Sequence, residues 1–327
     1  MTTSIYGFNI NQHGGPEVLL WRQLQLAPLA VGEVLIRHHA IGVNFIDIYH
    51  RQGLYPMALP AGLGLEAAGV VEAVGAGVTT VKPGDRVAYC KDSMGAYAEA
   101  SIVKADALIP LPDDIDFETA AACLLKGLTA AYLLFKTARL QSGAALLVHA
   151  AAGGVGCILT QWASALGQRV IGTVGDADKA VLARRNGCVA VINYREQDTV
   201  AAVKQLTGGR GVEVVFDSVG AATCDISLNV LARRGVFVSF GNASGAVDAI
   251  APLTLMQKGS LFMTRPALAH YIAERDEMLE LAGLLFDAIA KGIVTIQIGQ
   301  RWPLQQAAQA QIALAGRQTM GSTILLP

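Results

Sequence analysis

The sequence predicts an α/β protein with two domains, one built on a doubly wound parallel sheet and the other rich in β-strands. From about residue 144, apolar β-prone runs alternate with helix-like segments, a pattern typical of parallel sheets covered by helices. Residues 1–112 instead contain short strand-like runs separated by glycines and turn signals. At 327 residues the chain also exceeds the size at which one core usually stops growing.

The parallel sheet is expected to contain five strands joined by four helices through short loops. Apolar β-prone runs mark the strands, and a helical spacing of apolar residues marks the helices. The expected strands are residues 145–151, 169–174, 189–194, 212–219 and 235–241, and the expected helices are residues 155–167, 176–187, 198–208 and 224–234.

The β-rich region is punctuated by turns such as the KPGD segment at 82–85. Its clearest strands are expected at residues 33–42 and 85–90. The tail after about residue 267 is expected to return to this region, with an amphipathic helix at 270–292 and strands at 295–300 and 322–327.

Composition excludes several classes of protein. The 25 basic and 26 acidic residues leave no positive patch for a polyanion, which argues against nucleic-acid binding. The five cysteines are spaced too widely for a zinc or disulfide framework, so a reducing, cytoplasmic setting is expected. Residues 1–15 lack the features of a secretory signal. Residues 145–167 are long and apolar enough for a membrane helix, but a central glycine-rich turn argues against one.

The segment AAGGVG at 151–156 has the context of a dinucleotide-binding turn, because a strand precedes it and a helix follows it. Ala151 takes the place of the first glycine. Gly153 would let the backbone approach a pyrophosphate, and Gly156 would let the helix pack against the strand. A tight turn without a ligand would carry the same glycines, but the neighbouring β–α units favour the dinucleotide interpretation.

The end of the second strand bears on the choice of dinucleotide. NAD enzymes place an acidic residue there, whereas this chain has Thr173 or Val174. Asp176 is the alternative candidate for the acidic residue. We interpret Asp176 as the N-cap of the next helix. Lys179, one turn into that helix, would then reach a 2′-phosphate, or would lie on a solvated face. This spacing modestly favours NADPH.

Motifs along the whole chain resemble the zinc-free quinone oxidoreductases of the medium-chain dehydrogenase/reductase superfamily, related to zeta-crystallin. The specific combination is NFID at 44–47, HAAAGGVG at 149–156 and SFGN at 239–242. Further matching segments are HGGPEVL at 13–19, GLGLEAAGVV at 62–71, LLKGLTA at 124–130, VINYRE at 191–196, FDSVG at 216–220 and GSLFMTRP at 259–266.

The resemblance implies an architecture and a mode of assembly. Residues 1–124 and 267–327 would form a GroES-like catalytic domain, and residues 125–266 a Rossmann domain that binds NADPH. The active site would lie in the cleft between the two domains, and homodimers are common in the family.

The resemblance also bears on metal binding. Zinc-dependent relatives carry Gly-His-Glu where this chain has Gly64-Leu65-Glu66, and a cysteine where it has Asn44. Leu65 cannot bind a metal, and Asn44 is a poor zinc ligand. We therefore expect no zinc site, and we expect Glu66 to be mainly structural, with hydrogen bonds near the cleft.

By similarity, the cofactor contacts fall on matching positions. Asn44 and Asp47 would lie near the nicotinamide, Lys126 and Thr129 near the ribose and phosphates, and Lys179 and Tyr194 at the 2′-phosphate. For each, an ordinary structural role is the alternative. The remaining expected contacts are Gly153, Gly154 and Val155 at the pyrophosphate, Thr173 and Gly175 at the second strand end, and Ser218, Phe240, Gly241, Ser244, Phe262, Thr264 and Arg317 around the cleft.

The predicted chemistry is reduction of a quinone by NADPH, for which the protein supplies orientation and exclusion of water. Tyr49 and Tyr55 would line the acceptor pocket or merely pack, and Asn44 would donate a hydrogen bond to a carbonyl. No general acid is assigned, and His50 is expected to be structural. Two alternatives remain, an NADPH-dependent alkenal or enone reductase and a non-catalytic RNA-binding or structural protein.

Overall fold

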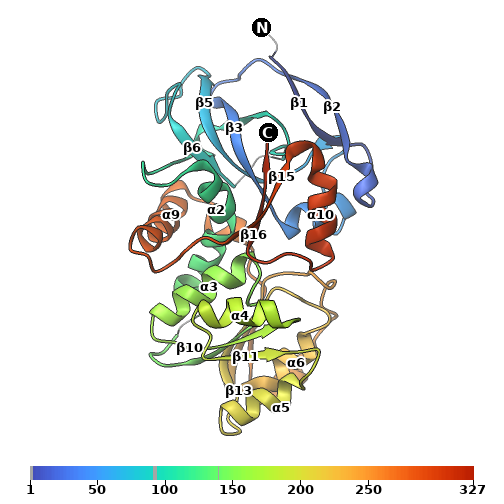
Figure 1. Ribbon diagram of the computed structural model, residues 1–327, viewed down its shortest axis with the longest axis vertical. Coiled ribbons are helices and arrows are strands. Elements are labelled where there is room, and N and C mark those ends of the chain that lie inside the picture. Colours follow the sequence, from blue (N-terminus) through green and yellow to red (C-terminus); the bar gives the residue numbers. More distant parts are fainter. Residues whose placement is uncertain (1–2, 91–93, 139) are drawn as a thin grey trace. The chain divides into compact units, whose positions relative to one another are not determined.

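The computed structural model describes residues 3–90, 94–138 and 140–327, shown in Figure 1. The chain forms two compact units. Unit 1 comprises Met1–Leu128, Ile272–Phe286 and Ile296–Pro327, and unit 2 comprises Thr129–Tyr271 and Asp287–Thr295. The functional domain boundaries expected at residues 124 and 267 stay a prediction.

Unit 2 is built on a six-stranded sheet in which every pair of neighbouring strands is parallel. Its order is β11-β10-β9-β12-β13-β14, so the chain runs outward from β9 to β11 and then continues on the other side of β9. This reversal creates a topological switch point between β9 and β12, where ligands of such sheets bind. The strands are β9 Ala145–Val148, β10 Arg169–Val174, β11 Ala190–Asn193, β12 Val212–Asp217, β13 Leu231–Ser239 and β14 Phe262–Thr264.

Helices cover both faces of this sheet, with α3 and α4 on one side and α5 and α6 on the other (Figure 1). The doubly wound parallel sheet predicted from the alternating pattern is thus confirmed. The helices of this unit are α3 Gly154–Ala165, α4 Ala177–Arg185, α5 Thr199–Leu206, α6 Cys224–Val230, α7 Pro252–Gln257 and α8 Leu268–Tyr271.

Two expectations for unit 2 were wrong. The helix expected at 224–234 ends at Val230, because Leu231 pairs with Val212 and begins β13. The sheet has a sixth strand, β14, whose Phe262 and Thr264 pair with Val236 and Val238 of β13. A three-residue edge strand carries no periodicity that would reveal it in the sequence.

Unit 1 contains a seven-stranded sheet with the order β15-β16-β3-β5-β6-β8, in which β7 also pairs with β3. A three-stranded sheet, β2-β1-β4, accompanies it. The strands are β1 Thr3–Ile10, β2 Leu20–Leu26, β3 Glu33–Val43, β4 Ala61–Gly62, β5 Glu66–Val74, β6 Arg86–Tyr89, β7 Ala100–Lys104, β8 Ile109–Pro110, β15 Ile298–Pro303 and β16 Ser322–Leu326.

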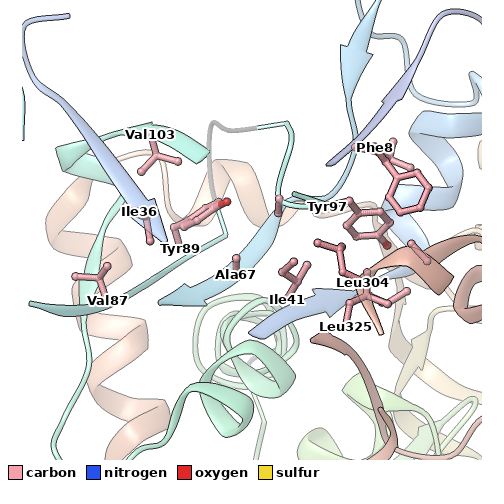
Figure 2. Packing of buried hydrophobic residues seen from close by; sticks show 14 of the residues in the cluster. Phe8, Ile36, Ile41, Ala67, Val87, Tyr89, Tyr97, Val103, Leu304 and Leu325 are labelled. Carbon is pink, nitrogen blue, oxygen red and sulfur yellow. The ribbon is translucent and has the colours of Figure 1, made fainter. Parts of the chain in front are cut away.

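Most of the tail lies in unit 1, whereas residues 267–271 and Asp287–Thr295 belong to unit 2. Strand β16 pairs antiparallel with β3, with Ile324 opposite Gly42 (Figure 1). The single long helix expected at 270–292 is instead interrupted between α8 and α9 (Arg275–Ala290), and the unpredicted α10 (Ala307–Ala315) precedes β16. Leu304 and Leu325 of this tail pack in one core with Phe8 and Ile41 of the N-terminal segment (Figure 2). Burial of such side chains stabilises the fold by about 1.5–3 kcal/mol each, so both chain ends contribute to the stability of unit 1.

Two helices complete the part of unit 1 that bears on function. Helix α1 (Phe45–Gln52) follows β3 directly, and Gly53 ends it in the left-handed conformation, with φ of 79°. Helix α2 (Phe117–Tyr132) continues into a π-helical turn, Leu133–Thr137. Residues Phe117–Thr137 are long and apolar enough to cross a membrane, but 78% of the apolar window is buried inside the protein. A buried core helix of a folded domain has the same composition.

Candidate functional site

The glycine-rich turn of unit 2 connects β9 to α3 at the switch point of the sheet. The Ala151 N–H donates to the Thr173 carbonyl of the neighbouring strand (3.1 Å), and the Gly153 N–H donates to the Ala150 carbonyl (2.9 Å). The first intrahelical bond runs from the Cys157 N–H to the Gly153 carbonyl (2.8 Å). The N–H groups of the preceding turn, including those of the predicted Gly154 and Val155, are therefore at the open end of the helix, where an anion can bind.

Glycine is required at 156 by the close approach of helix and turn. A Cβ atom there would overlap the carbonyl oxygen of Ala150 and lie 2.9 Å from the Cα of Ala151. At Gly153 the nearest atom, the same carbonyl oxygen, would be 3.2 Å away. Ala150 itself has φ of 51°, a left-handed conformation that disfavours residues other than glycine. The geometry agrees with the predicted packing role of Gly156.

Asp176 is the N-cap of α4, as predicted. Its Oδ1 accepts from the Lys179 N–H (2.9 Å), and its Oδ2 forms an ion pair with the Lys179 Nζ (3.1 Å). These contacts, with the nearby charge of Arg195, lower the pKa of the Asp176 carboxyl. A Cβ on Gly175 would lie 2.6 Å from the Tyr194 hydroxyl and 3.6 Å from the Arg195 Nε. The ends of β10 and β11 therefore bring together Gly175, Lys179 and Tyr194, with Arg195 as an added cation.

Arg195 is a residue that the sequence interpretation missed. It follows Tyr194 directly in the VINYRE motif, and that adjacency was the available signal. Thr173, in contrast, is 1% exposed and its hydroxyl contacts the Nδ1 of His149 (3.0 Å). Its side chain is directed into the unit rather than toward solvent.

Further predicted contacts lie at the carboxyl ends of β12 and β13. The Phe240 N–H donates to the Asp217 carbonyl (2.8 Å), and the Ser244 hydroxyl donates to the Val219 carbonyl (2.8 Å). A Cβ on Gly241 would lie 2.9 Å from the Cα of Ser218. The structure thus groups Ser218, Phe240, Gly241 and Ser244.

The other expected contacts are more dispersed. Thr264 ends β14, whereas Phe262 begins that strand and is 61% exposed. Thr129 is buried in α2. Arg317 follows α10 in unit 1 and is exposed, with φ of 58°.

In unit 1, Glu66 is the centre of a buried polar cluster. The carboxylate is fully buried at the start of β5. Its Oε2 accepts from the Asn44 Nδ2 (2.7 Å) and the Lys126 Nζ (3.1 Å), and its Oε1 accepts from the Leu125 N–H (2.7 Å). A carboxylate accepts only, so three donors satisfy it and Lys126 balances its charge. These contacts support the structural role expected of Glu66.

Glu66 also fixes the orientation of the Asn44 amide. Because the carboxylate cannot donate, the nitrogen of Asn44 must face it and the amide oxygen must face away. The amide oxygen is used in the capping box of α1, where it faces the Asp47 backbone N–H, so one N–H of Asn44 remains for another partner. This N–H is available for the hydrogen bond that Asn44 is predicted to donate to a substrate carbonyl.

Asp47 is also fully buried, in the first turn of α1. Its Oδ2 accepts from the Asn44 backbone N–H (2.9 Å) and from the Tyr97 hydroxyl (2.8 Å). Burial outweighs these two donors and raises the pKa of the Asp47 carboxyl to about 7. Asp47 is thus a weak acid inside unit 1, a property that the sequence did not reveal.

The Asp47 carboxyl predicts a specific pH dependence of stability. Its native pKa lies above the unfolded value of 3.8, so the native state binds more protons between the two and stability falls as pH rises through about 7. Asp47→Asn removes this titration and keeps an oxygen for both donors. The difference in unfolding free energy between the variant and wild type is expected to be about 2–3 kcal/mol more favourable to the variant at about pH 9 than at about pH 5. Urea unfolding at both pH values measures this, and an equal difference at both would contradict it.

The two candidate pocket tyrosines pack against each other. The ring centroids of Tyr49 and Tyr55 are 5.2 Å apart in an edge-on arrangement, and Tyr49 is 7% exposed. His50 contacts the Tyr55 ring, with centroids 5.7 Å apart. Tyr55 is the more accessible of the two tyrosines. This arrangement is compatible with both the packing role and the role as part of a pocket wall.

No group of three or more His, Cys, Asp or Glu side chains with the geometry of a metal site occurs among the described residues. Leu65 and Asn44 supply neither thiolate nor imidazole at the positions where zinc-dependent relatives carry ligands.

The glycine-rich turn at a switch point, the cationic group at the next strand end and the accompanying β-rich unit define a nucleotide-dependent oxidoreductase of the two-domain dehydrogenase type. Comparison with known proteins gives the particular family. Residues 30–113 match the alcohol dehydrogenase GroES-like domain, and residues 154–282 match the zinc-binding dehydrogenase family. The chain belongs to the quinone oxidoreductases of the medium-chain dehydrogenase/reductase superfamily.

Individual relatives cover nearly the whole chain. Quinone oxidoreductase 1 of Escherichia coli is 50% identical over 97% of this chain and 98% of its own. A 2-haloacrylate reductase of Burkholderia sp. is 44% identical over 97% of this chain and 98% of its own. The crystal structure of an Escherichia coli quinone oxidoreductase complexed with NADPH matches with a TM-score of 0.94 and 48% identity, over 99% of this chain and 100% of that one.

Proposed function

We propose that this protein is an NADPH-dependent, zinc-independent quinone reductase. The observation that carries the proposal is the presence of two cations, Lys179 and Arg195, around Asp176 at the end of β10, where the Tyr194 hydroxyl lies close to Gly175. These cations stand at the strand end where NAD enzymes use an acid to bind the ribose. Asp176, which lies at this strand end, is occupied as the N-cap of α4 and in an ion pair with Lys179. Relatives named quinone oxidoreductases, one of them bound to NADPH, support both the cofactor and the acceptor.

The residues of unit 2 suit the cofactor. The open end of α3 and the Gly153–Gly156 turn would bind the pyrophosphate, and Lys179 and Tyr194 the 2′-phosphate. When bound, NADPH supplies the hydride for the reduction. We assign the remaining predicted contacts to the same cofactor, and residues 1–124 and 267–327 to a catalytic domain beside a Rossmann domain at 125–266.

In unit 1, the proposed catalytic group is Asn44, with Tyr49 and Tyr55 as walls for a planar acceptor. Glu66 holds the Asn44 amide in one orientation, so its second N–H is positioned before any ligand arrives. Lys126, a proposed ribose and phosphate contact, is held by the same carboxylate. In a reduction driven by the cofactor, the main contribution of the protein is to orient the reacting groups in this way.

A second candidate function is reduction of a conjugated carbon–carbon double bond. The 44% identity to a 2-haloacrylate reductase favours it specifically. Turnover of NADPH with a panel of ortho- and para-quinones tests the first function, and the absence of turnover with all of them would remove it. Product analysis with an enone tests the second, since a saturated ketone would support it. Binding of single-stranded RNA that NADPH does not displace would instead indicate a non-catalytic role.

Lys179→Ala is expected to raise the KM for NADPH about ten- to hundredfold, because a charge-assisted contact to the 2′-phosphate is lost. The KM for NADH should change far less, since NADH lacks that phosphate. Lys204→Ala, which removes an exposed lysine at the end of α5, is the matched control. Steady-state kinetics with both cofactors measures the effect. Equal changes for NADPH and NADH would contradict the assignment.

We also propose a homodimer that forms through the edge of the sheet of unit 2. Strand β14 is the edge strand, and α7 beside it has no buried residue. Leu253 and Met256 of α7 are 58% and 56% exposed, and such apolar side chains are suited to a twofold contact. Sedimentation velocity should show a dimer that Leu253→Glu with Met256→Glu converts to a monomer. Ile312→Glu, an exposed site in unit 1, should leave the mass unchanged.

A cytoplasmic location is proposed from the cysteines. All five cysteine side chains are buried, and burial raises the pKa of the Cys188 thiol to about 12. Thiols of this kind are inert core residues, as is usual in reducing compartments.

A further inference from the structure

A buried chain of hydrogen bonds connects three adjacent strands of unit 2 at their carboxyl ends. His149, directly after β9, contacts the Thr173 hydroxyl of β10 through Nδ1 (3.0 Å) and the Ser227 hydroxyl of α6 through Nε2 (3.2 Å). Ser227 in turn donates to the Asp217 Oδ2 at the end of β12 (2.7 Å). All four residues are 3% exposed or less. The chain therefore runs beneath the switch point, shielded from water.

The positions of the protons in this chain follow from the chemistry of its ends. The Asp217 carboxylate accepts only, so the single proton of Ser227 is directed to it. The Nε2 of His149 must then donate to the Ser227 oxygen. Burial lowers the pKa of His149, so the ring is neutral and its Nδ1 carries no proton. Nδ1 accepts from the Thr173 hydroxyl, and every contact has one donor and one acceptor.

The same residues hold the backbone segments around the proposed cofactor site. The His149 N–H donates to the Phe216 carbonyl of β12 (3.0 Å), and the next residue, Ala150, begins the glycine-rich turn in a left-handed conformation. The Asp217 Oδ1 accepts from the N–H groups of Val219 (2.7 Å) and Gly220 (3.1 Å), which fixes the loop that carries Ser218. One imidazole thus couples the turn after β9, the end of β10 and the loop after β12.

We infer that His149, as the neutral Nε2–H tautomer, is a positioning residue that holds the pyrophosphate-binding turn and the Ser218 loop in their binding-competent arrangement. The inference rests on the proposed NADPH function. A buried, fully satisfied hydrogen-bond chain specifies one arrangement of its members, whereas an apolar side chain of similar size would leave the hydroxyls of Thr173 and Ser227 without this partner. The turn would then be disordered in the free protein, and the cost of ordering it on binding would weaken cofactor binding.

Titration of the purified protein with NADPH tests the inference, with binding followed by calorimetry. His149→Leu is expected to raise the Kd for NADPH at least about tenfold, while His149→Gln, which keeps a donor toward Ser227, is expected to stay within about threefold of wild type. His38→Leu is the matched control, because His38 is an equally buried histidine that bonds the Ala98 carbonyl and the Tyr89 hydroxyl in unit 1. It should lower stability without this change in Kd.

Nitrogen-15 NMR of the wild-type histidines gives a second readout that does not depend on any variant. The His149 ring should show a protonated Nε2 and an unprotonated Nδ1 at neutral pH. A protonated Nδ1, or a wild-type Kd in folded His149→Leu, would overturn the inference. If His149→Leu does not fold, Ser227→Ala replaces it, with the same expected direction and the same overturning result. Failure of the wild-type protein to bind NADPH would instead refute the proposed function.

Discussion

Replacement of Glu66 by alanine is expected to lower the free energy of unfolding by about 3–5 kcal/mol, the cost of leaving one member of a buried ion pair alone. The Lys126 ammonium would remain buried without its carboxylate, and the Asn44 amide and the Leu125 N–H would lose their acceptor. Urea unfolding followed by tryptophan fluorescence measures the change. Because the carboxylate also orients the Asn44 amide, hydride transfer by the molecules that remain folded should fall as well, but we expect the larger loss in folding.

Glu72 in the same strand provides the matched control. Its carboxylate pairs with Arg37 (3.0 Å), but both side chains are about 40% exposed, at 43% and 40%. Solvent screens such a pair, so Glu72→Ala is expected to cost less than about 1 kcal/mol. The double variant Glu66→Ala with Lys126→Ala should recover part of the loss, because no lone charge remains. A cost for Glu66→Ala as small as that for Glu72→Ala would show that the cluster is unimportant for stability.

Gly156→Ala is expected to raise the Kd for NADPH more than tenfold and to cost about 1–3 kcal/mol of stability. The added methyl group would overlap the Ala150 carbonyl and lie 2.9 Å from the Cα of Ala151. These are backbone atoms that cannot move aside as a flexible side chain does. Either the turn shifts or α3 moves away from β9, and both displace the helix end that would bind the pyrophosphate. Calorimetric titration with NADPH and thermal unfolding measure the two effects.

Gly283→Ala separates this effect from the general consequence of adding a methyl group to a helix. Gly283 lies in α9, where an added Cβ would have no atom within 4 Å. Alanine at an open helical position is expected to stabilise by about 0.5–1 kcal/mol. If Gly156→Ala behaved like Gly283→Ala, the close approach of turn and helix would have no role in binding.

The local patterns of the sequence predicted those parts of the structure that depend on near neighbours. The alternation of apolar runs and helical segments predicted the five longer strands of the parallel sheet. The position of Asp176 at the start of the helical segment predicted the N-cap, which the structure confirms. The same reasoning missed β14, because a short edge strand obtains its structure from pairing with β13 rather than from its own residues. It extended the helix at 224–234 too far for the same reason, since pairing with β12 draws Leu231 into a strand.

In the candidate site, too, the sequence indicated single residues, whereas their contacts with distant residues appeared only in the structure. The motifs indicated Asn44, Glu66 and Lys126 as separate positions, but they did not show that one carboxylate connects all three across 22 and 60 residues of sequence. Only the structure shows that the Arg195 Nε lies near Gly175. The partners of Asp47 are a backbone neighbour and Tyr97, which is 50 residues away. Its weak acidity follows from complete burial, a quantity that no local pattern contains.

By itself, the sequence determined the alternation of strands and helices and the glycine-rich turn. Each of these depends on residue type and spacing within one segment. Only the tertiary structure decided which polar side chains share a buried environment. It joined Glu66 to Lys126 and Asn44, and His149 to Thr173, Ser227 and Asp217. The physical reason is that the protonation and orientation of a buried group depend on partners distant in the chain, which only packing brings within hydrogen-bonding distance.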